Sequence, residues 1–311
     1  MCAFLLYGEN RVIWGGIQMD GVEYRKALFM ERKLLVLDID GTLVNSKKEI
    51  TPKTKEAIFK IMDAGHLVMI ASGRPTPGVR KYVKELELTE RGGYCLNFNG
   101  ALVTDCKTGE KVYEQKIPVS FVPGLYAFAE KHDIGILTYT EDIGMTGEFI
   151  KEEGPKVVFG NRMDQYLQLE ADINQLDSFL TPDFPGYVTY DPYKILYTIP
   201  PEKGEELEAE LAALYKGQLE IMRSESFFLE AMLLGIDKGT TLDRIIGPLG
   251  IKHENVICCG DGYNDVPMVR YAGIGVAMQN AKDAVKEVAD YITEATNDED
   301  GIAEVIEKFI L

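Results

Sequence analysis

The 311-residue sequence is poor in positive charge, and this deficit narrows what the protein can do. It has 33 basic residues against 50 acidic ones, and its formal net charge is −17. Because such a chain repels phosphate backbones and anionic lipid surfaces, neither a nucleic acid nor a membrane is an expected partner. No apolar run approaches the roughly 20 residues of a membrane span, and no basic segment of a signal peptide precedes the apolar first residues. We therefore expect a cytoplasmic protein.

Cysteine and histidine are also sparse. The five cysteines form no CxxC pair, and together with the three histidines they show no metal-ligand spacing. An odd number of cysteines without such a framework is typical of reduced thiols. Neither a Walker loop nor a GxGxxG motif is present, which argues against a kinase or a dinucleotide-dependent dehydrogenase.

Two kinds of patterning divide the chain. From Leu34 onward, buried apolar strands alternate with helices, which is typical of an α/β fold with a doubly wound, mostly parallel sheet. A segment richer in Tyr, Pro and Gly interrupts this alternation. We predict a Rossmann-like catalytic core formed by residues 30–116 and 222–311, and an inserted α+β cap at residues 117–221 that selects the substrate. Residues 1–29 show no sustained period and are interpreted as an N-terminal extension upstream of the fold.

Acidic residues follow two of the predicted strands. Asp38 and Asp40 end the first strand, and two carboxylates at this spacing point the same way and repel each other unless a cation lies between them. A later strand is followed by Asp261, Asn264 and Asp265, which are hard oxygen donors suited to Mg²⁺. An acidic turn and a helix N-cap are the structural alternatives for these two motifs.

Two weaker motifs are positioned to serve the same site. Ser72, Gly73 and Arg74 follow the second strand and offer a hydroxyl and a main-chain N–H to an oxyanion, although a plain Ser-Gly turn has the same sequence. Lys238 begins a predicted helix, where the helix dipole disfavours a cation. An anionic partner would explain it, and a solvated lysine is the alternative. In open α/β sheets, ligands collect at the carboxyl ends of the strands, where we expect these motifs to meet.

The order and placement of the four motifs resemble the haloacid dehalogenase (HAD) superfamily. The resemblance is to its Cof-type phosphatases, which carry a large α/β cap between the second and third motifs, and it extends over residues 31–311. The 34 residues from Asp38 to Ser72 leave no room for a large early cap, whereas the 166 residues from Ser72 to Lys238 do. Neither the first motif nor the acidic loop departs from the family pattern.

The resemblance implies a phosphatase that forms an aspartyl-phosphate intermediate. Asp38 would attack phosphorus. Asp40 would protonate the leaving alcohol and then activate water, for which we expect a raised pKa. The resemblance implies that Mg²⁺ is bound by Asp38, Asp261, Asp265 and the main-chain carbonyl of Asp40. It implies phosphate binding by Ser72, Gly73, Lys238 and Asn264. Arg74 and Asn99 are the implied substrate contacts.

The sequence therefore predicts a Mg²⁺-dependent phosphoric monoester hydrolase acting on small phosphorylated metabolites. Sugar phosphates are the expected substrates. A hexose phosphomutase of related fold and a non-catalytic phospholigand-binding protein are the two alternatives. The sequence carries no prediction of an oligomeric state.

Overall fold

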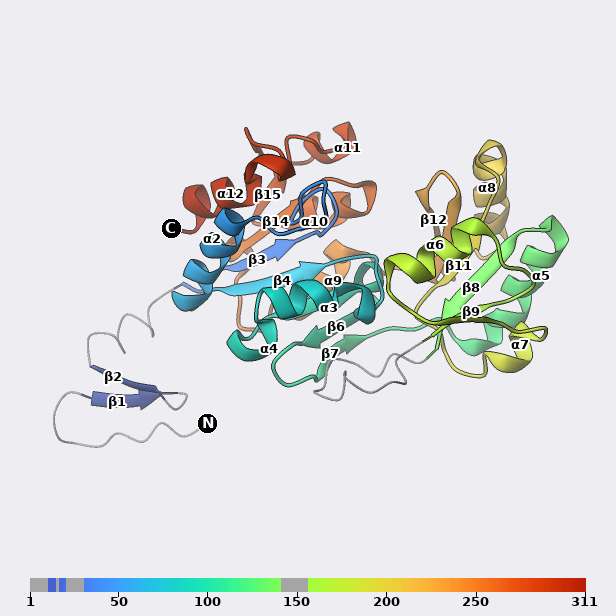
Figure 1. Cartoon of the computed structure of the whole chain (residues 1–311), viewed down its shortest axis with the longest axis horizontal. Coiled ribbons are helices and arrows are strands. Elements are labelled where there is room, and N and C mark those ends of the chain that lie inside the picture. Colours follow the sequence, from blue (N-terminus) through green and yellow to red (C-terminus); the bar gives the residue numbers. More distant parts are fainter. Residues whose placement is uncertain (1–10, 15–16, 21–30, 141–155) are drawn as a thin grey trace.

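The computed structural model describes residues 11–14, 17–20, 31–140 and 156–311. It shows two large β-sheets, each with its own helices (Figure 1). The predicted N-terminal extension lies mostly outside the described residues, and within it β1 (Arg11–Trp14) and β2 (Ile17–Asp20) pair antiparallel. Across the described ranges, no helix combines the length and the apolar character that crossing a membrane requires.

The larger unit is built on an eight-stranded sheet in the order β16-β15-β14-β3-β4-β5-β6-β7. Its strands are β3 (Leu34–Leu37), β4 (Leu67–Ala71), β5 (Tyr94–Asn97), β6 (Leu102–Asp105), β7 (Lys111–Glu114), β14 (Val256–Gly260), β15 (Ile274–Ala277) and β16 (Tyr291–Ile292). Neighbouring strands from β16 to β5 are parallel, whereas β5, β6 and β7 pair antiparallel. The predicted doubly wound, mostly parallel sheet is confirmed.

Helices cover both faces of this sheet (Figure 1). They are α2 (Pro52–Asp63), α3 (Thr76–Glu85), α4 (Leu88–Arg91), α9 (Lys238–Ile245), α10 (Val266–Tyr271), α11 (Asp283–Lys286) and α12 (Gly301–Phe309), with 3₁₀ turns η1 (Phe98–Gly100), η4 (His253–Asn255), η5 (Tyr263–Asp265) and η6 (Asn297–Glu299). The crossover through α2 runs from β3 to β4, and the one through α10 runs in the opposite direction, from β14 to β15. Because such crossovers are right-handed, α2 and α10 lie on opposite faces.

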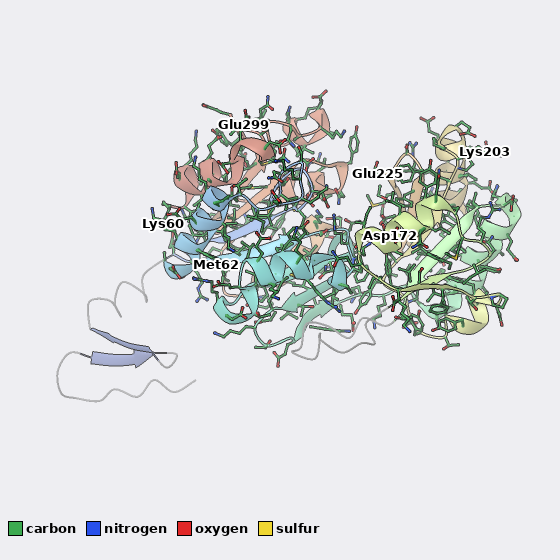
Figure 2. The ribbon with its side chains drawn as sticks, viewed as in Figure 1. Lys60, Met62, Asp172, Lys203, Glu225 and Glu299 are labelled. Atoms are coloured by element: carbon green, nitrogen blue, oxygen red, sulfur yellow. The ribbon has the colours of Figure 1, made fainter. Side chains whose placement is uncertain are left out.

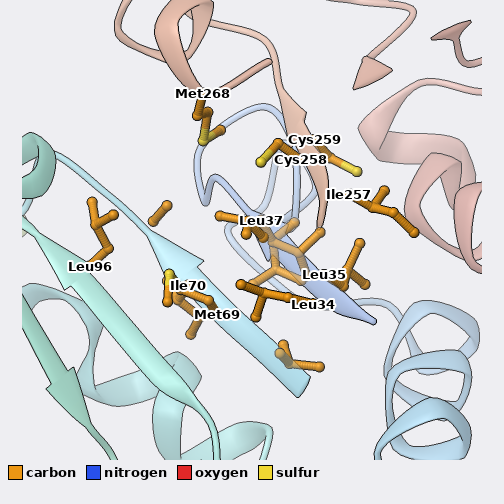
Figure 3. Close-up of a cluster of buried hydrophobic side chains, with 14 of the residues drawn as sticks. Leu34, Leu35, Leu37, Met69, Ile70, Leu96, Ile257, Cys258, Cys259 and Met268 are labelled. Carbon is orange, nitrogen blue, oxygen red and sulfur yellow. The ribbon is translucent and has the colours of Figure 1, made fainter. Parts of the chain in front are cut away.

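The centre of the sheet is apolar on both faces. Every residue of β3 and β14 is buried, including the vicinal pair Cys258 and Cys259. In Figure 3, the leucines of β3 lie beside Met69 and Ile70 of β4. Burying one such side chain contributes about 1.5–3 kcal/mol, so this layer holds the ends of β3 and β14 in fixed positions. The four described cysteines are buried and free, in agreement with the predicted reduced thiols.

The second unit is the inserted α+β cap that the sequence predicts. Its six-stranded sheet has the order β10-β9-β8-β11-β13-β12, and β9 and β10 are its parallel pair. The strands are β8 (Gly135–Tyr139), β9 (Val157–Phe159), β10 (Ser178–Leu180), β11 (Ile195–Thr198), β12 (Leu219–Glu225) and β13 (Phe228–Leu233). The helical segments are η2 (Val119–Phe121), α5 (Val122–His132), α6 (Gln165–Ile173), α7 (Phe184–Tyr187), η3 (Pro201–Lys203) and α8 (Gly204–Leu214).

The return from the cap to the core lies later than predicted. The predicted boundary between residues 221 and 222 falls inside β12, and β12 pairs with β13 in the cap sheet. The cap sheet therefore continues to Leu233, and the chain re-enters the core at α9. The hydrophobic pattern is weak in β12 because this edge strand leaves most of its side chains exposed or half-buried, whereas the buried run of β13 looks equally like a core strand.

Candidate active site

The two central strands end at the switch point of the core sheet. β3 and β14 are parallel neighbours whose crossovers depart in opposite directions, an arrangement that opens a crevice at the carboxyl ends of the strands. Asp38 directly follows β3, Asp261 directly follows β14, and Ser72 directly follows β4. Lys238, the first residue of α9, extends its side chain to the same edge. The structure thus brings the four motifs together.

Lys238 is fully buried at the centre of this site. Its Nζ donates to Oδ1 of Asp38 at 2.7 Å, to Oδ1 of Asp265 at 2.6 Å and to the carbonyl oxygen of Ala71 at 2.9 Å. Burial would lower the pKa of this lysine, but the two carboxylates outweigh burial and raise its pKa, so the ammonium group stays charged. Its anionic partners are therefore carboxylates of the protein, and a phosphate contact requires one of its three N–H groups to change partner.

Three carboxylates form a compact acidic cluster beside this ammonium group. Among the described residues, one oxygen from each of Asp38, Asp261 and Asp265 lies within 4.8 Å of the other two. Burial, followed by the charge of Asp265, raises the pKa of Asp261 to about 6 and also raises the pKa of Asp38. Because Lys238 offsets only one of the three carboxylates, the cluster fits a divalent cation that prefers oxygen ligands.

Hydrogen bonds hold the acidic loop in place. Oδ2 of Asp265 accepts from the main-chain N–H groups of Asp261 and the glycine after it, both at 2.9 Å. The predicted alternative of a helix N-cap is not what is found, because no described side chain caps α10, the helix that follows Asp265. Oγ1 of Thr42 donates to Oδ1 of Asp261 at 3.0 Å. Gly41 lies between these groups with a φ of +82°, and a Cβ atom there would be 2.3 Å from Oδ2 of Asp261. The turn after the first motif therefore requires glycine.

Asp40 is bound differently from the prediction. Its carboxylate lies outside the acidic cluster and accepts from Nε and Nη2 of Arg74 at 3.0 and 2.7 Å, and from Nζ of Lys48 at 2.6 Å. Burial would raise the pKa of Asp40, but the charges and hydrogen bonds of Arg74 and Lys48 outweigh burial and lower it. The expected raised pKa is thus wrong, because Arg74, 34 residues away, and Lys48, 8 residues away, converge on the carboxylate.

The remaining predicted residues line the same edge. Ser72 is buried, and its Oγ accepts from the main-chain N–H of Arg74 at 3.2 Å. Asn99 lies at the tip of the β5–β6 hairpin with a φ of +53°, and its Oδ1 accepts from Nδ2 of Asn264 at 3.0 Å. A Cβ atom on Gly73 would be 2.9 Å from the same Oδ1. The hairpin, the acidic loop and the loop after β4 therefore meet at Asn99.

Two charged residues of the cap also reach this edge, and the sequence analysis missed them. Nζ of Lys194 donates to the carbonyl oxygen of Gly73 at 3.3 Å and to Oε1 of Glu230 at 3.2 Å. Oε2 of Glu230 accepts from Nδ2 of Asn99 at 3.4 Å. The signal that would have found them is a charge within an apolar run, since Lys194 directly precedes β11 and Glu230 interrupts the buried strand β13.

Comparisons with known proteins agree with this geometry. A family profile described as haloacid dehalogenase-like hydrolase matches residues 35–306. The chain is 31% identical over 280 residues to 5-amino-6-(5-phospho-D-ribitylamino)uracil phosphatase YcsE of Bacillus subtilis (strain 168), covering 90% of this chain and 96% of the relative. A solved haloacid dehalogenase-like hydrolase from Bacteroides thetaiotaomicron is 41% identical with a TM-score of 0.79, covering 89% of this chain and 99% of that chain. A solved HAD subclass IIB sugar phosphatase is 29% identical with a TM-score of 0.72, and the match covers 89% of this chain and 98% of that chain.

Proposed function

Because the chain belongs to the haloacid dehalogenase-like hydrolases and is a phosphatase of that family, we propose that it hydrolyses sugar phosphates with the help of Mg²⁺ and through an aspartyl-phosphate on Asp38. The observation that carries this proposal is the position of Asp38, which lies at the switch point, contacts Lys238 and is one of the three carboxylates of the acidic cluster. The substrate class is supported by the relative named as a sugar phosphatase and by the relative whose named substrate is a phosphorylated ribitylamino compound.

Asp38 has the anchoring that a nucleophile needs. Its main-chain N–H donates to the carbonyl oxygen of Cys259 at 3.1 Å, which ties it to β14. Lys238 holds Oδ1 and stabilises the ionised form, against a burial that raises the pKa of Asp38. Within the described part of the chain, no side chain donates to Oδ2, so this oxygen is free to form a bond to phosphorus while the bond to the leaving oxygen breaks.

Mg²⁺ fits the oxygen atoms of Asp38 and Asp261, with the main-chain carbonyl of Asp40 as a further ligand. Asp265 already accepts hydrogen bonds from Lys238 and from two main-chain N–H groups, so we place it behind these ligands as support. When bound, the ion neutralises negative charge on the phosphoryl oxygens and orients them.

Asp40 is the proposed base and acid. The ionised form that Arg74 and Lys48 favour is the form that takes a proton from the attacking water in the second step. Protonating the leaving alcohol in the first step requires the neutral form of Asp40, and its ion pair with Arg74 must therefore loosen when the substrate binds.

Three neighbouring groups are proposed to hold the phosphoryl oxygens. They are the hydroxyl of Ser72, the main-chain N–H of Gly73 and the side-chain amide of Asn264, which carry no net charge and lie at the carboxyl ends of β4 and β14. Donors placed in this way stabilise the charge that spreads over the phosphoryl oxygens, and removing one typically lowers the rate by about 10²–10³.

Phosphate release from a panel of sugar phosphates, nucleotides and phosphorylated cofactors tests the proposal. We expect hydrolysis of at least one sugar phosphate, loss of activity in EDTA and recovery in Mg²⁺. Asp38→Asn should abolish turnover, whereas Glu287→Gln, which changes an exposed carboxylate, should not. Full activity of Asp38→Asn would exclude it as the nucleophile. Hexose phosphate isomerisation without net phosphate release would favour the mutase, and binding without turnover would favour the phospholigand-binding protein.

A further inference from the structure

The boundary between cap and core contains a buried ion pair that the proposed chemistry does not use. The side chains of Lys194 and Glu230, both from the cap, are 3% and 5% exposed, and their charged atoms are 3.2 Å apart. By contrast, charged side chains labelled in Figure 2, such as Lys60 on the core and Asp172 on the cap, are exposed. Because desolvation offsets most of the attraction in a buried pair, such a pair contributes little net stability and its presence needs another reason.

The pair lies against residues that are proposed to hold the substrate. Lys194 contacts the carbonyl oxygen of Gly73, and Glu230 accepts from Asn99, which is itself bonded to Asn264 of the acidic loop. A continuous chain of polar contacts thus runs from the acidic loop through the hairpin tip to the cap. Since Gly73 and Asn264 are proposed to hold the phosphoryl oxygens, the leaving group attached to that phosphoryl group would lie close to this chain of contacts.

The hydrogen bonds of the pair are few and long. Nζ of Lys194 has three N–H groups, and within the described residues it finds two acceptors, at 3.2 and 3.3 Å. Each carboxylate oxygen of Glu230 receives one hydrogen bond, at 3.2 or 3.4 Å. For comparison, the three bonds of Lys238 measure 2.6–2.9 Å. Nζ of Lys194 also lies 5.9 Å from the centroid of the Tyr139 ring, a weak contact that a hydrogen-bond acceptor can replace. The pair can therefore take a further polar partner.

We propose that Lys194 and Glu230 are specificity-determining residues that bind a hydroxyl group of the leaving group. A hydroxyl accepts from the ammonium group and donates to the carboxylate at the same time, so an alcohol or a vicinal diol matches the pair. A second phosphate or a carboxylate is repelled by Glu230, and an apolar leaving group leaves both charges without a new partner. The inference rests on the proposed function and narrows its substrates to phosphate esters of polyhydroxylated compounds.

Steady-state kinetics with two substrates tests the pair. The variants are Lys194→Met and Glu230→Gln, and the substrates are the best sugar phosphate of the panel and p-nitrophenyl phosphate, whose leaving group carries no further hydroxyl. We expect kcat/KM for the sugar phosphate to fall about 10- to 100-fold in each variant, while that for p-nitrophenyl phosphate stays within about threefold. Lys203→Met, which removes an exposed lysine of the cap, is the matched control and should change neither value.

A double variant covers the case in which a single unpaired charge prevents folding. Lys194→Met combined with Glu230→Leu leaves no buried charge behind and should show the same loss of selectivity. Equal losses with both substrates would indicate that the pair only fastens the cap, and unchanged values with both would exclude any role in recognition. Either result overturns the inference. A wild-type protein inactive toward every phosphate ester would instead refute the proposed function.

Discussion

The acidic cluster predicts that the metal-free protein loses stability as the pH rises from about 4 to about 6. Burial and the charge of Asp265 raise the pKa of Asp261 from 3.8 to about 6 in the folded chain. Because the folded chain then holds this proton more tightly than the unfolded chain, the free energy of unfolding falls as the pH rises between these two values. The shift of about two units corresponds to roughly 3 kcal/mol, an upper value because Asp261 is only partly buried. The raised pKa of Asp38 acts in the same direction.

Mg²⁺ should reverse this trend, since a bound cation replaces the proton that the cluster otherwise retains. Urea unfolding at pH 5.0 and 7.5, in EDTA and in Mg²⁺, measures both effects. We expect Asp261 alone to make the metal-free protein about 1–1.5 kcal/mol less stable at pH 7.5 than at pH 5.0, because only the interval from pH 5.0 to about 6 contributes. Mg²⁺ should remove most of this difference.

Two variants separate Asp261 from the other titrating groups. Asp261→Asn should weaken the pH dependence in EDTA and leave the part that Asp38 contributes, whereas Glu287→Gln, which changes an exposed carboxylate, should preserve the dependence in full. A metal-free protein that gains stability between pH 5.0 and 7.5, or a dependence that Asp261→Asn leaves unchanged, would refute the raised pKa of Asp261. A pH dependence that Mg²⁺ does not alter would refute the cluster as its binding site.

Two further predictions concern the residues around the cluster. Arg74→Met removes the main cation from Asp40, so the pKa of Asp40 should rise and the acidic limb of the profile of kcat/KM against pH should move to higher pH. Arg74→Lys is the control that keeps a charge, and an unmoved limb would contradict the role of Asp40 as the base. Gly41→Ala places a Cβ atom against Asp261 and should weaken Mg²⁺ binding, measured as the Mg²⁺ concentration that activity requires. Gly217 has a similar positive φ with open space around it, so the control Gly217→Ala should lower only the free energy of unfolding, by about 1 kcal/mol. Equal effects of the two variants on Mg²⁺ binding would exclude the close contact as the cause.

The floor of the site was predictable because its residues follow buried strands. The apolar runs that become β3 and β14 are visible in the sequence, and the geometry of a parallel sheet brings Asp38 and Asp261 together at their ends. Lys238 was predictable for another reason. A lysine at a helix start conflicts with the helix dipole, and the partners that resolve the conflict are the buried carboxylates of Asp38 and Asp265.

The contacts of the cap with the core and the ionisation of Asp40 could not be predicted, because no local sequence pattern indicates them. Lys194 meets Gly73 across 121 residues, and Glu230 meets Asn99 across 131, so these contacts exist only because the cap lies against the core. The ionisation of Asp40 depends in the same way on where Arg74 and Lys48 extend their side chains. Hydrophobic periodicity places strands and helices, but the direction of a long charged side chain is determined by tertiary packing.

The acidity that first excluded nucleic acids now bears on substrate selection. The segment 117–221 holds 7 basic and 19 acidic residues, and Lys194, which reaches from this segment to the core, has its charge matched by Glu230. A neutral pair adds no net attraction for the phosphoryl group, so binding of that group is left to Lys238, the neutral donors of the core and Mg²⁺. A neutral pair still discriminates between leaving groups, because a hydroxyl satisfies both of its members whereas a second anion satisfies one and is repelled by the other.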